Sequence, residues 1–155
     1  MTELRSRMQG RVCLVTGATA GIGEVTALEL ARLGATVIIV GRNAQKCATV
    51  VAQIKAQTNN PNLDHMVADL SRQRDIRQLV LQFKQKYTQL HVLINNAGAT
   101  FSTRQMTAEG FEMTWALNHL NYFLLTHLLL DLLKASAPAR IINVSSGAHL
   151  MGEID

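Results

Sequence analysis

The chain has 155 residues, of which 48% are hydrophobic and 17% are charged, and its formal net charge is +4 at pH 7. This size and composition predict one folded domain spanning residues 1–155 and exclude a disordered chain. The basic residues are scattered along the sequence, which excludes a nucleic-acid-binding arm and is compatible with a small anionic ligand.

The first half of the chain alternates short apolar runs with segments of helical periodicity. A β-branched run at 11–16 predicts a strand, and the segment 21–34, which ends in glycine, predicts a helix. The run at 36–40 lacks polar alternation, as expected for a strand buried on both faces. Residues 43–57 carry apolar side chains at helical spacing and predict a second helix.

The second half continues this alternation. A third strand is predicted at 65–70, followed by a helix for which Ser71 is the expected N-cap. Further strands are predicted at 91–95 and 140–144. The stretch 107–135 between them predicts one long helix, which is apolar nearly all round and therefore expected to be buried.

Five strands alternating with helices predict an α/β fold, a doubly wound Rossmann-type parallel sheet. Right-handed crossovers would place helices on both faces, and if the first three strands run outward and the chain then reverses, the strand order is 3-2-1-4-5. Ligands of such sheets bind beyond the carboxyl ends of the strands, at the switch between strands 1 and 4. The polar and glycine-rich segments of this sequence fall at those strand ends.

The segment TGATAGIG at 16–23 lies between the first strand and the first helix. Gly17 can form the tight turn, Gly21 lets the backbone approach a pyrophosphate, and Gly23 lets the helix pack closely on the sheet. The helix N-terminus adds free N–H groups and a partial positive charge. An ordinary glycine turn is the alternative, which the preceding strand and following helix disfavour.

Further motifs accompany TGxxxGIG: ADL at 68–70, NNAG at 95–98, the asparagine in WALNHLNYFLLT, and INVSS at 142–146. Together they resemble the short-chain dehydrogenase/reductase family over almost the whole chain, most closely its retinol-dehydrogenase-like branch. This resemblance implies hydride transfer between a nicotinamide dinucleotide and an alcohol or carbonyl compound. Asn121 and Tyr122 depart from the usual Gly-His of that branch, so its substrate is not carried over.

The resemblance implies a cofactor site along the strand ends. Asp69 would lie near the adenine, although it could instead simply end a strand. Asn95 is better suited to bonding at a strand end than to reacting. The residues assigned to the cofactor are Gly17, Thr19, Ala20, Gly21, Ile22, Gly23, Arg42, Asn43, Asp69, Leu70, Asn95, Ala97 and Gly98.

The end of the second strand favours NADP(H) over NAD(H). An NAD site usually carries an acidic residue there, on the ribose 2′-hydroxyl. This chain has Gly41 and Arg42 there, with no acidic residue between Glu29 and Asp64. A guanidinium suits a 2′-phosphate because it can bind the phosphate through two hydrogen bonds. A solvated surface arginine is the alternative.

The resemblance also assigns two catalytic residues. Ser146 would polarise the substrate oxygen and Asn118 would support a water relay. The family completes this tetrad with a tyrosine and a lysine four residues later, but neither Tyr87 nor Tyr122 has a lysine at that spacing. We therefore expect a chain truncated before this motif, without the family's last strands and inactive alone.

Two alternative functions remain at this stage. One is a non-catalytic dinucleotide-binding module. The other is a Rossmann-like site for FAD or S-adenosylmethionine, which the combined motifs disfavour. Metal-ligand spacing is absent, and structural roles are expected, for His91, His119, His127 and His149.

Composition also predicts where the chain resides and how it behaves. Cys13 and Cys47 are expected to be free buried thiols in a reducing compartment, and no apolar leader or membrane-spanning run is found, which together predict a cytoplasmic location. Met113 and Trp115 are expected in the core. An unpaired strand at 140–144 and the long apolar helix predict self-association.

Overall fold

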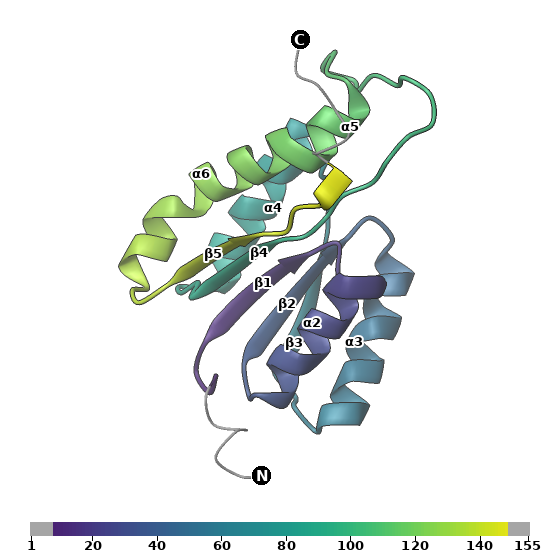
Figure 1. Ribbon diagram of the computed structural model, residues 1–155. Helices are drawn as coiled ribbons and strands as arrows, with labels where there is room; N and C mark the ends of the chain where they lie inside the picture. Colours follow the sequence, from purple (N-terminus) through teal and green to yellow (C-terminus); the bar gives the residue numbers. More distant parts are fainter. Residues whose placement is uncertain (1–7, 149–155) are drawn as a thin grey trace.

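A computed structural model describes residues 8–148 of the chain (Figure 1). Its sheet has five strands in the order β3-β2-β1-β4-β5, and every pair is parallel. The predicted fold class and strand order are therefore confirmed. The strands are β1 (Val12–Thr16), β2 (Thr36–Gly41), β3 (Leu63–Val67), β4 (Val92–Asn95) and β5 (Arg140–Asn143).

Helices cover both faces of this sheet (Figure 1). On one face α2 (Gly21–Arg32) and α3 (Ala44–Thr58) pack together, and on the other α4 (Gln73–Lys86) packs with α6 (Asn121–Ala135). Successive residues of the strands point into alternate layers. The hydrophobic core is accordingly split into two clusters, with Leu14 on the α4 and α6 side and Val15 on the α2 and α3 side.

The third strand and the following helix begin differently from the prediction. Strand β3 ends at Val67, so Asp69 lies beyond it. Ser71 is not the helix N-cap, because its backbone N–H and its hydroxyl both donate to Asp69 Oδ1, at 3.0 and 2.7 Å. Glu109 caps α4 instead, since its Oε1 accepts from Gln73 N at 3.0 Å. Because Ser71 bonds to the aspartate two residues before it, its hydroxyl does not cap the helix.

The long predicted helix is wrong in its first part and in its burial. Regular structure begins with α5 (Met113–Trp115), continues through a π-helical turn at Ala116–Leu120, and becomes α6. Trp115 and Phe123 are 53% and 68% exposed, so Trp115 does not belong to the core. The buried face of α6 is a single stripe formed by Asn121, Leu125, Leu129 and Leu133.

Within residues 8–148, no helix combines the length and apolar character needed to cross a membrane. The described chain begins at the amino end of β1 and stops just beyond the carboxyl end of β5, which forms the edge of the sheet beside α6 (Figure 1). The carboxyl ends of β1 and β4, where the chain reverses direction across the sheet, carry the candidate site.

Candidate functional site

The turn after β1 requires glycine for two separate reasons. Gly17 has φ +66°, and a Cβ there would lie 2.7 Å from Ala97 Cα. A Cβ on Gly23 would lie 2.5 Å from both Asn96 Nδ2 and the Gly17 carbonyl oxygen. The two residues therefore occupy the places predicted for a tight turn and for close helix packing.

Gly21 differs from its two neighbours because the space around it is open. It has φ +59°, and no atom lies within 4 Å of the position a Cβ would take. The N-cap of α2 is Ala20, which offers no side-chain acceptor to the first N–H groups of the helix. An open backbone cradle at an uncapped helix N-terminus suits a phosphate, so these residues fit a dinucleotide pyrophosphate.

A hydrogen-bonded latch joins the ends of β1 and β4 beneath this turn. Thr16 Oγ1 donates to Ile94 O at 3.3 Å and accepts from the N–H groups of Asn96 and Ala97 at 2.9 and 3.0 Å. Asn96 Nδ2 donates to the carbonyls of Thr16 and Gly17 at 2.9 and 3.2 Å. Sequence reasoning missed Thr16 and Asn96, although the second asparagine of NNAG was a signal.

The first asparagine of NNAG is bound on the other side of the sheet end. Asn95 is fully buried, and its Nδ2 donates to Thr126 Oγ1 at 3.0 Å and to Asn143 Oδ1 at 2.8 Å. It thus ties β4 to both α6 and β5, in the strand-end role expected for it. Its Oδ1 has no hydrogen-bond partner within residues 8–148.

A glycine lies where β2 ends. A Cβ on Gly41 would lie 2.7 Å from Thr19 Cγ2 and 2.8 Å from Cys47 Sγ, so a larger residue there would make one of these two side chains shift. Arg42 follows it and is exposed, and no carboxylate in the described part of the chain pairs with it. Asn43 caps α3 by accepting from Lys46 N at 2.9 Å.

The remaining predicted adenine contacts follow β3. The Ala68 N–H donates to Gly41 O at 3.1 Å, which continues the sheet bonding one residue beyond the strands. Asp69 Oδ1 is occupied by Ser71, and its Oδ2 lies 3.6 Å from Arg72 Nε. Leu70 is buried. Asp69 and Leu70 therefore follow the carboxyl end of β3, as Arg42 follows the carboxyl end of the neighbouring β2. Both carboxylate oxygens of Asp69 already face partners within the chain.

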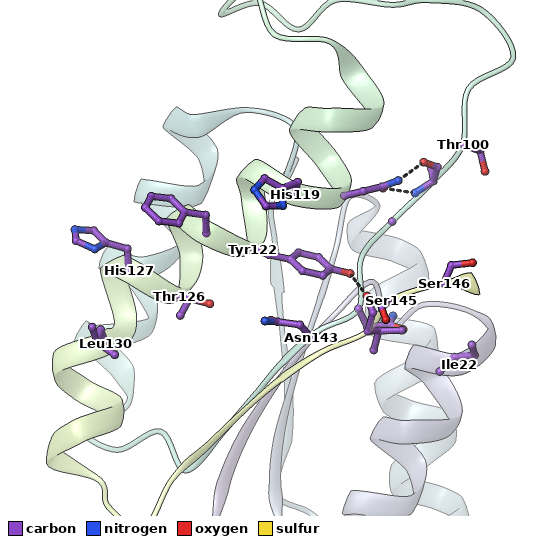
Figure 2. Close-up of a pocket in the computed structure, with 16 residues that line it drawn as sticks. Ile22, Thr100, His119, Tyr122, Thr126, His127, Leu130, Asn143, Ser145 and Ser146 are labelled. Atoms are coloured by element: carbon purple, nitrogen blue, oxygen red, sulfur yellow. Dashed lines mark hydrogen bonds between the residues drawn. The ribbon is translucent and has the colours of Figure 1, made fainter. Parts of the chain in front are cut away.

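A cleft of about 1060 Å³ opens between the carboxyl strand ends and α6 (Figure 2). It brings together four predicted residues from distant parts of the chain: Ile22, Gly98, Asn118 and Ser146. Figure 2 shows Tyr122 reaching from α6 toward Ser145 across this cleft. Tyr122 was not predicted to belong to the site.

Asn118 lies in the π-helical turn and is fixed to the loop after NNAG. Its Oδ1 accepts from the Ala99 N–H and its Nδ2 donates to the Ala99 carbonyl, both at 2.9 Å (Figure 2). A Cβ on Gly98 would lie 3.1 Å from Asn118 Oδ1, which explains the small residue there. π-Helical turns inside helices are frequent at functional sites.

The serines lie just beyond the end of β5. Ser146 is exposed, and its Oγ accepts from Ala148 N at 3.1 Å. The Tyr122 hydroxyl donates weakly to Val144 O at 3.5 Å, while the Val144 N–H donates to Asn95 O at 2.9 Å. Burial raises the pKa of Tyr122, so its phenol stays protonated.

Metal-binding and disulfide chemistry find no support in residues 8–148, where no group of three or more His, Cys, Asp or Glu could hold a metal. His91 Nδ1 accepts from Val12 N at 3.0 Å, a structural role as expected. His149 lies outside the described residues. Cys13 and Cys47 are free and buried, and burial raises the pKa of Cys13 to about 12.

Comparison with known proteins matches this arrangement to one family. The family model described as short chain dehydrogenase matches residues 11–155. Human Retinol dehydrogenase 13 is 44% identical over 97% of this chain and 46% of its own length. Human Polyprenol dehydrogenase is 48% identical over 94% of this chain and 45% of its own length. The chain thus spans about half the length of the curated relatives it matches.

Solved structures give the same result. The Pseudomonas aeruginosa RhlG/NADP active-site complex superimposes with a TM-score of 0.84 at 34% identity, over 99% of this chain and 61% of that one. A short-chain dehydrogenase from Shigella flexneri 2a complexed with NADP superimposes with a TM-score of 0.80 at 30% identity, over 96% of this chain and 64% of that one.

Proposed function

The chain belongs to the short-chain dehydrogenase family, and from this premise we propose that it is the NADP(H)-binding portion of an oxidoreductase. The substrate class is an alcohol or carbonyl compound. The observation that carries the proposal is the open cradle at Gly21 below the uncapped N-terminus of α2, on the same strand ends as Asn118 and Ser146. The NADP complexes among the structural neighbours support it.

The phosphates of the cofactor would bind along residues 16–23, where backbone N–H groups carry the partial positive charge of the helix end. Arg42 would bind the 2′-phosphate. Preference for NADP(H) over NAD(H) rests on Gly41, which supplies no carboxylate to bind a 2′-hydroxyl, and on an Arg42 without an acidic partner in the described residues.

One side chain of the cleft would act on the substrate directly. Ser146 would donate a hydrogen bond to the substrate oxygen, while Asn118 would hold the loop at Ala99, which lines the same cleft. The nicotinamide, when bound, supplies or accepts the hydride. The sequence contains no Tyr-x-x-x-Lys, so the phenol and ammonium that would move the proton are missing from these 155 residues.

Without this tyrosine and lysine, the 155 residues lack the acid–base pair of the reaction. General acid–base catalysis contributes roughly 10²–10⁴-fold to a rate. We therefore propose that the 155-residue chain binds NADP(H) without measurable turnover. Without turnover, the chain would behave as a dinucleotide-binding module, which is the second candidate function. The open space at Gly21 and the uncapped N-terminus of α2 favour this function too.

We also propose that the chain associates with a second copy through β5. Ile141 and Ile142 are 41% and 46% exposed on this edge strand. An unpaired apolar edge is a template for pairing with another chain. A reducing compartment such as the cytoplasm is proposed on a separate ground, since both cysteines are free and buried.

Introducing a negative charge into the cradle tests the proposed function. Gly21→Asp places a carboxylate where the pyrophosphate would bind, and like charges in contact cost several kcal/mol. Gly110→Asp is the matched control, because Gly110 also has positive φ, at +83°, and open space around it. We expect NADPH titration, followed by fluorescence, to show binding to the wild type and the Gly110 variant only. Equal binding to both variants would contradict the proposal.

A further inference from the structure

The π-helical turn before α6 leaves one backbone carbonyl without its usual donor. In an α-helix the Asn121 N–H would donate to the Leu117 carbonyl, four residues back. Here it donates to the Ala116 carbonyl, five residues back. The side chain of Asn121 takes its place, because Nδ2 donates to the Leu117 carbonyl. Asn121 is only 1% exposed, so this bond is made away from water.

The orientation of this buried amide is fixed by its surroundings. The reverse orientation would press Oδ1 against the Leu117 carbonyl, two acceptors in contact. Oδ1 therefore faces away, and it has no hydrogen-bond partner within residues 8–148. A buried acceptor without a partner destabilises the folded state. The unpaired Oδ1 therefore offsets part of what the Nδ2 bond to the Leu117 carbonyl contributes to stability.

Asn118 lies within the π-helical turn to which Asn121 is bonded. A π-helical turn inserts one extra residue, and each residue turns a helix by about 100°. Helix α6 is anchored to the core by Leu125 and Leu129, which are fully buried. If the turn relaxed to α-helical bonding, residues before it would rotate relative to α6, and Asn118 would lose its two bonds to Ala99.

We propose that Asn121 is a positioning residue that stabilises the π-helical turn and thereby keeps Asn118 bonded to Ala99 at the cleft. The significance of this for catalysis rests on the proposed function. The geometry itself does not need a cofactor, so it can be tested in its absence.

Serine and alanine at position 121 form a matched pair for this test. A serine hydroxyl can donate to the carbonyl four residues back. Thr26, Thr58 and Ser136 of this chain each make that bond at 2.7 Å. Alanine is of nearly the same size and has no donor. Both variants remove the unpaired Oδ1 and leave similar cavities, so they differ only in the bond that the proposal requires.

Two local signals report on the turn. Trp115 is the one tryptophan in the sequence, and it stacks on His119 at 4.2 Å across the turn. Its fluorescence should match the wild type in Asn121→Ser and change in Asn121→Ala. The Ala99 amide, which donates to Asn118 at 2.9 Å, should exchange with solvent about tenfold faster in the alanine variant, the equivalent of losing one hydrogen bond.

A second pair and a stability control complete the experiment. If Asn121→Ala does not fold, the isosteric pair Asn121→Thr and Asn121→Val asks the same question. Leu129→Ala lowers stability from the same helix without touching the turn, and it should leave Trp115 fluorescence unchanged in the folded state. Identical signals in the donor and non-donor variants would overturn the inference. Absence of NADPH binding in the wild type would instead count against the proposed function.

Discussion

The two edges of the sheet are built differently. At β3, Asp64 accepts hydrogen bonds from Lys86 Nζ at 2.6 Å and from the Tyr87 hydroxyl at 2.8 Å, so an ion pair and a polar hydroxyl lie near the start of the strand. At β5 all four residues are exposed, and two of them are isoleucines. Charges protect an edge strand from pairing with other chains, whereas exposed apolar residues do not.

The same contrast divides the candidate site. From β1 to β3, Gly17, Gly23 and Gly41 are packed so closely that an added Cβ would lie under 3.0 Å from a neighbouring atom, whereas Gly21 faces open space. Toward β5, the site is an open cleft bordered by exposed Ser146 and by the exposed face of α6. The side proposed to bind the nucleotide is therefore closely packed, while the side proposed for the reaction is open.

The largest effect on stability is expected in the closely packed part of the site, from β1 to β3, which we call the closed side. Gly17→Ala combines positive φ with a Cβ 2.7 Å from Ala97 Cα, so it should lower the free energy of unfolding by at least about 2 kcal/mol. Gly147→Ala on the open side meets no atom within 4 Å and should change it by less than about 0.5 kcal/mol. Urea unfolding of both variants measures the difference. Similar losses would remove the proposed contrast.

Cofactor selectivity should follow the closed side as well. Arg42→Ala should weaken NADPH binding by about 1.5–3 kcal/mol, the scale of hydrogen bonds to a charged group, and leave NADH binding nearly unchanged. Arg72→Ala, which removes the arginine beside Asp69, is the control for a general loss of positive charge. Titration of each variant with both cofactors decides the question, and equal losses for NADPH and NADH would contradict the 2′-phosphate assignment.

The two edges can be compared directly with a matched pair of substitutions. Val67 on β3 and Ile142 on β5 have almost the same exposure, 45% and 46%. Ile142→Lys should abolish self-association at tens of micromolar, while Val67→Lys should leave it unchanged, because two adjacent exposed isoleucines lie on β5 and a single exposed valine lies on β3. Light scattering measures both. A monomeric wild type, or the same response to both lysines, would show that β5 is not an association surface.

The smallest effect is expected for the pH dependence of stability. His91, just before β4, accepts a hydrogen bond at Nδ1 from the Val12 N–H of β1. Burial, aided by the nearby Arg11 charge, lowers the pKa of His91 below its ordinary 6.5. The folded state thus favours neutral His91, and its contribution to stability is complete above pH 6.5 and lost as pH falls through the lower folded pKa. His91→Gln should flatten this decline in urea unfolding between pH 5 and 8. Parallel curves would contradict it.

Much of the fold could be predicted because its signals are local. The runs at β1 and β2 are apolar without interruption, and glycines mark the turns between elements. The strand order followed from the handedness of crossovers. Local signals gave a wrong prediction where two nearby residues compete for one bond. Ser71 could serve as an N-cap, but its hydroxyl donates to Asp69 instead.

The candidate site was predictable only where glycine or a short motif marks it. The side-chain bond from Asn121 to Leu117 depends on the π-helical turn, which has no sequence signal of its own. Exposure of Trp115 could not be read from an apolar helix either, since it depends on which neighbours reach that face. Thr16 and Asn96 are bonded across 80 residues, beyond the range of periodicity.

One measurement tests the central claim, that the nucleotide side is complete and the reacting side is not. The wild-type chain is titrated with NADPH and then assayed for NADPH oxidation with a panel of aldehydes and ketones, beside Ser146→Ala. The account predicts saturable NADPH binding and no turnover above background in either protein. Turnover that Ser146→Ala loses would show that the cleft already forms a working site, and failure to bind NADPH would show that the closed side does not hold the cofactor.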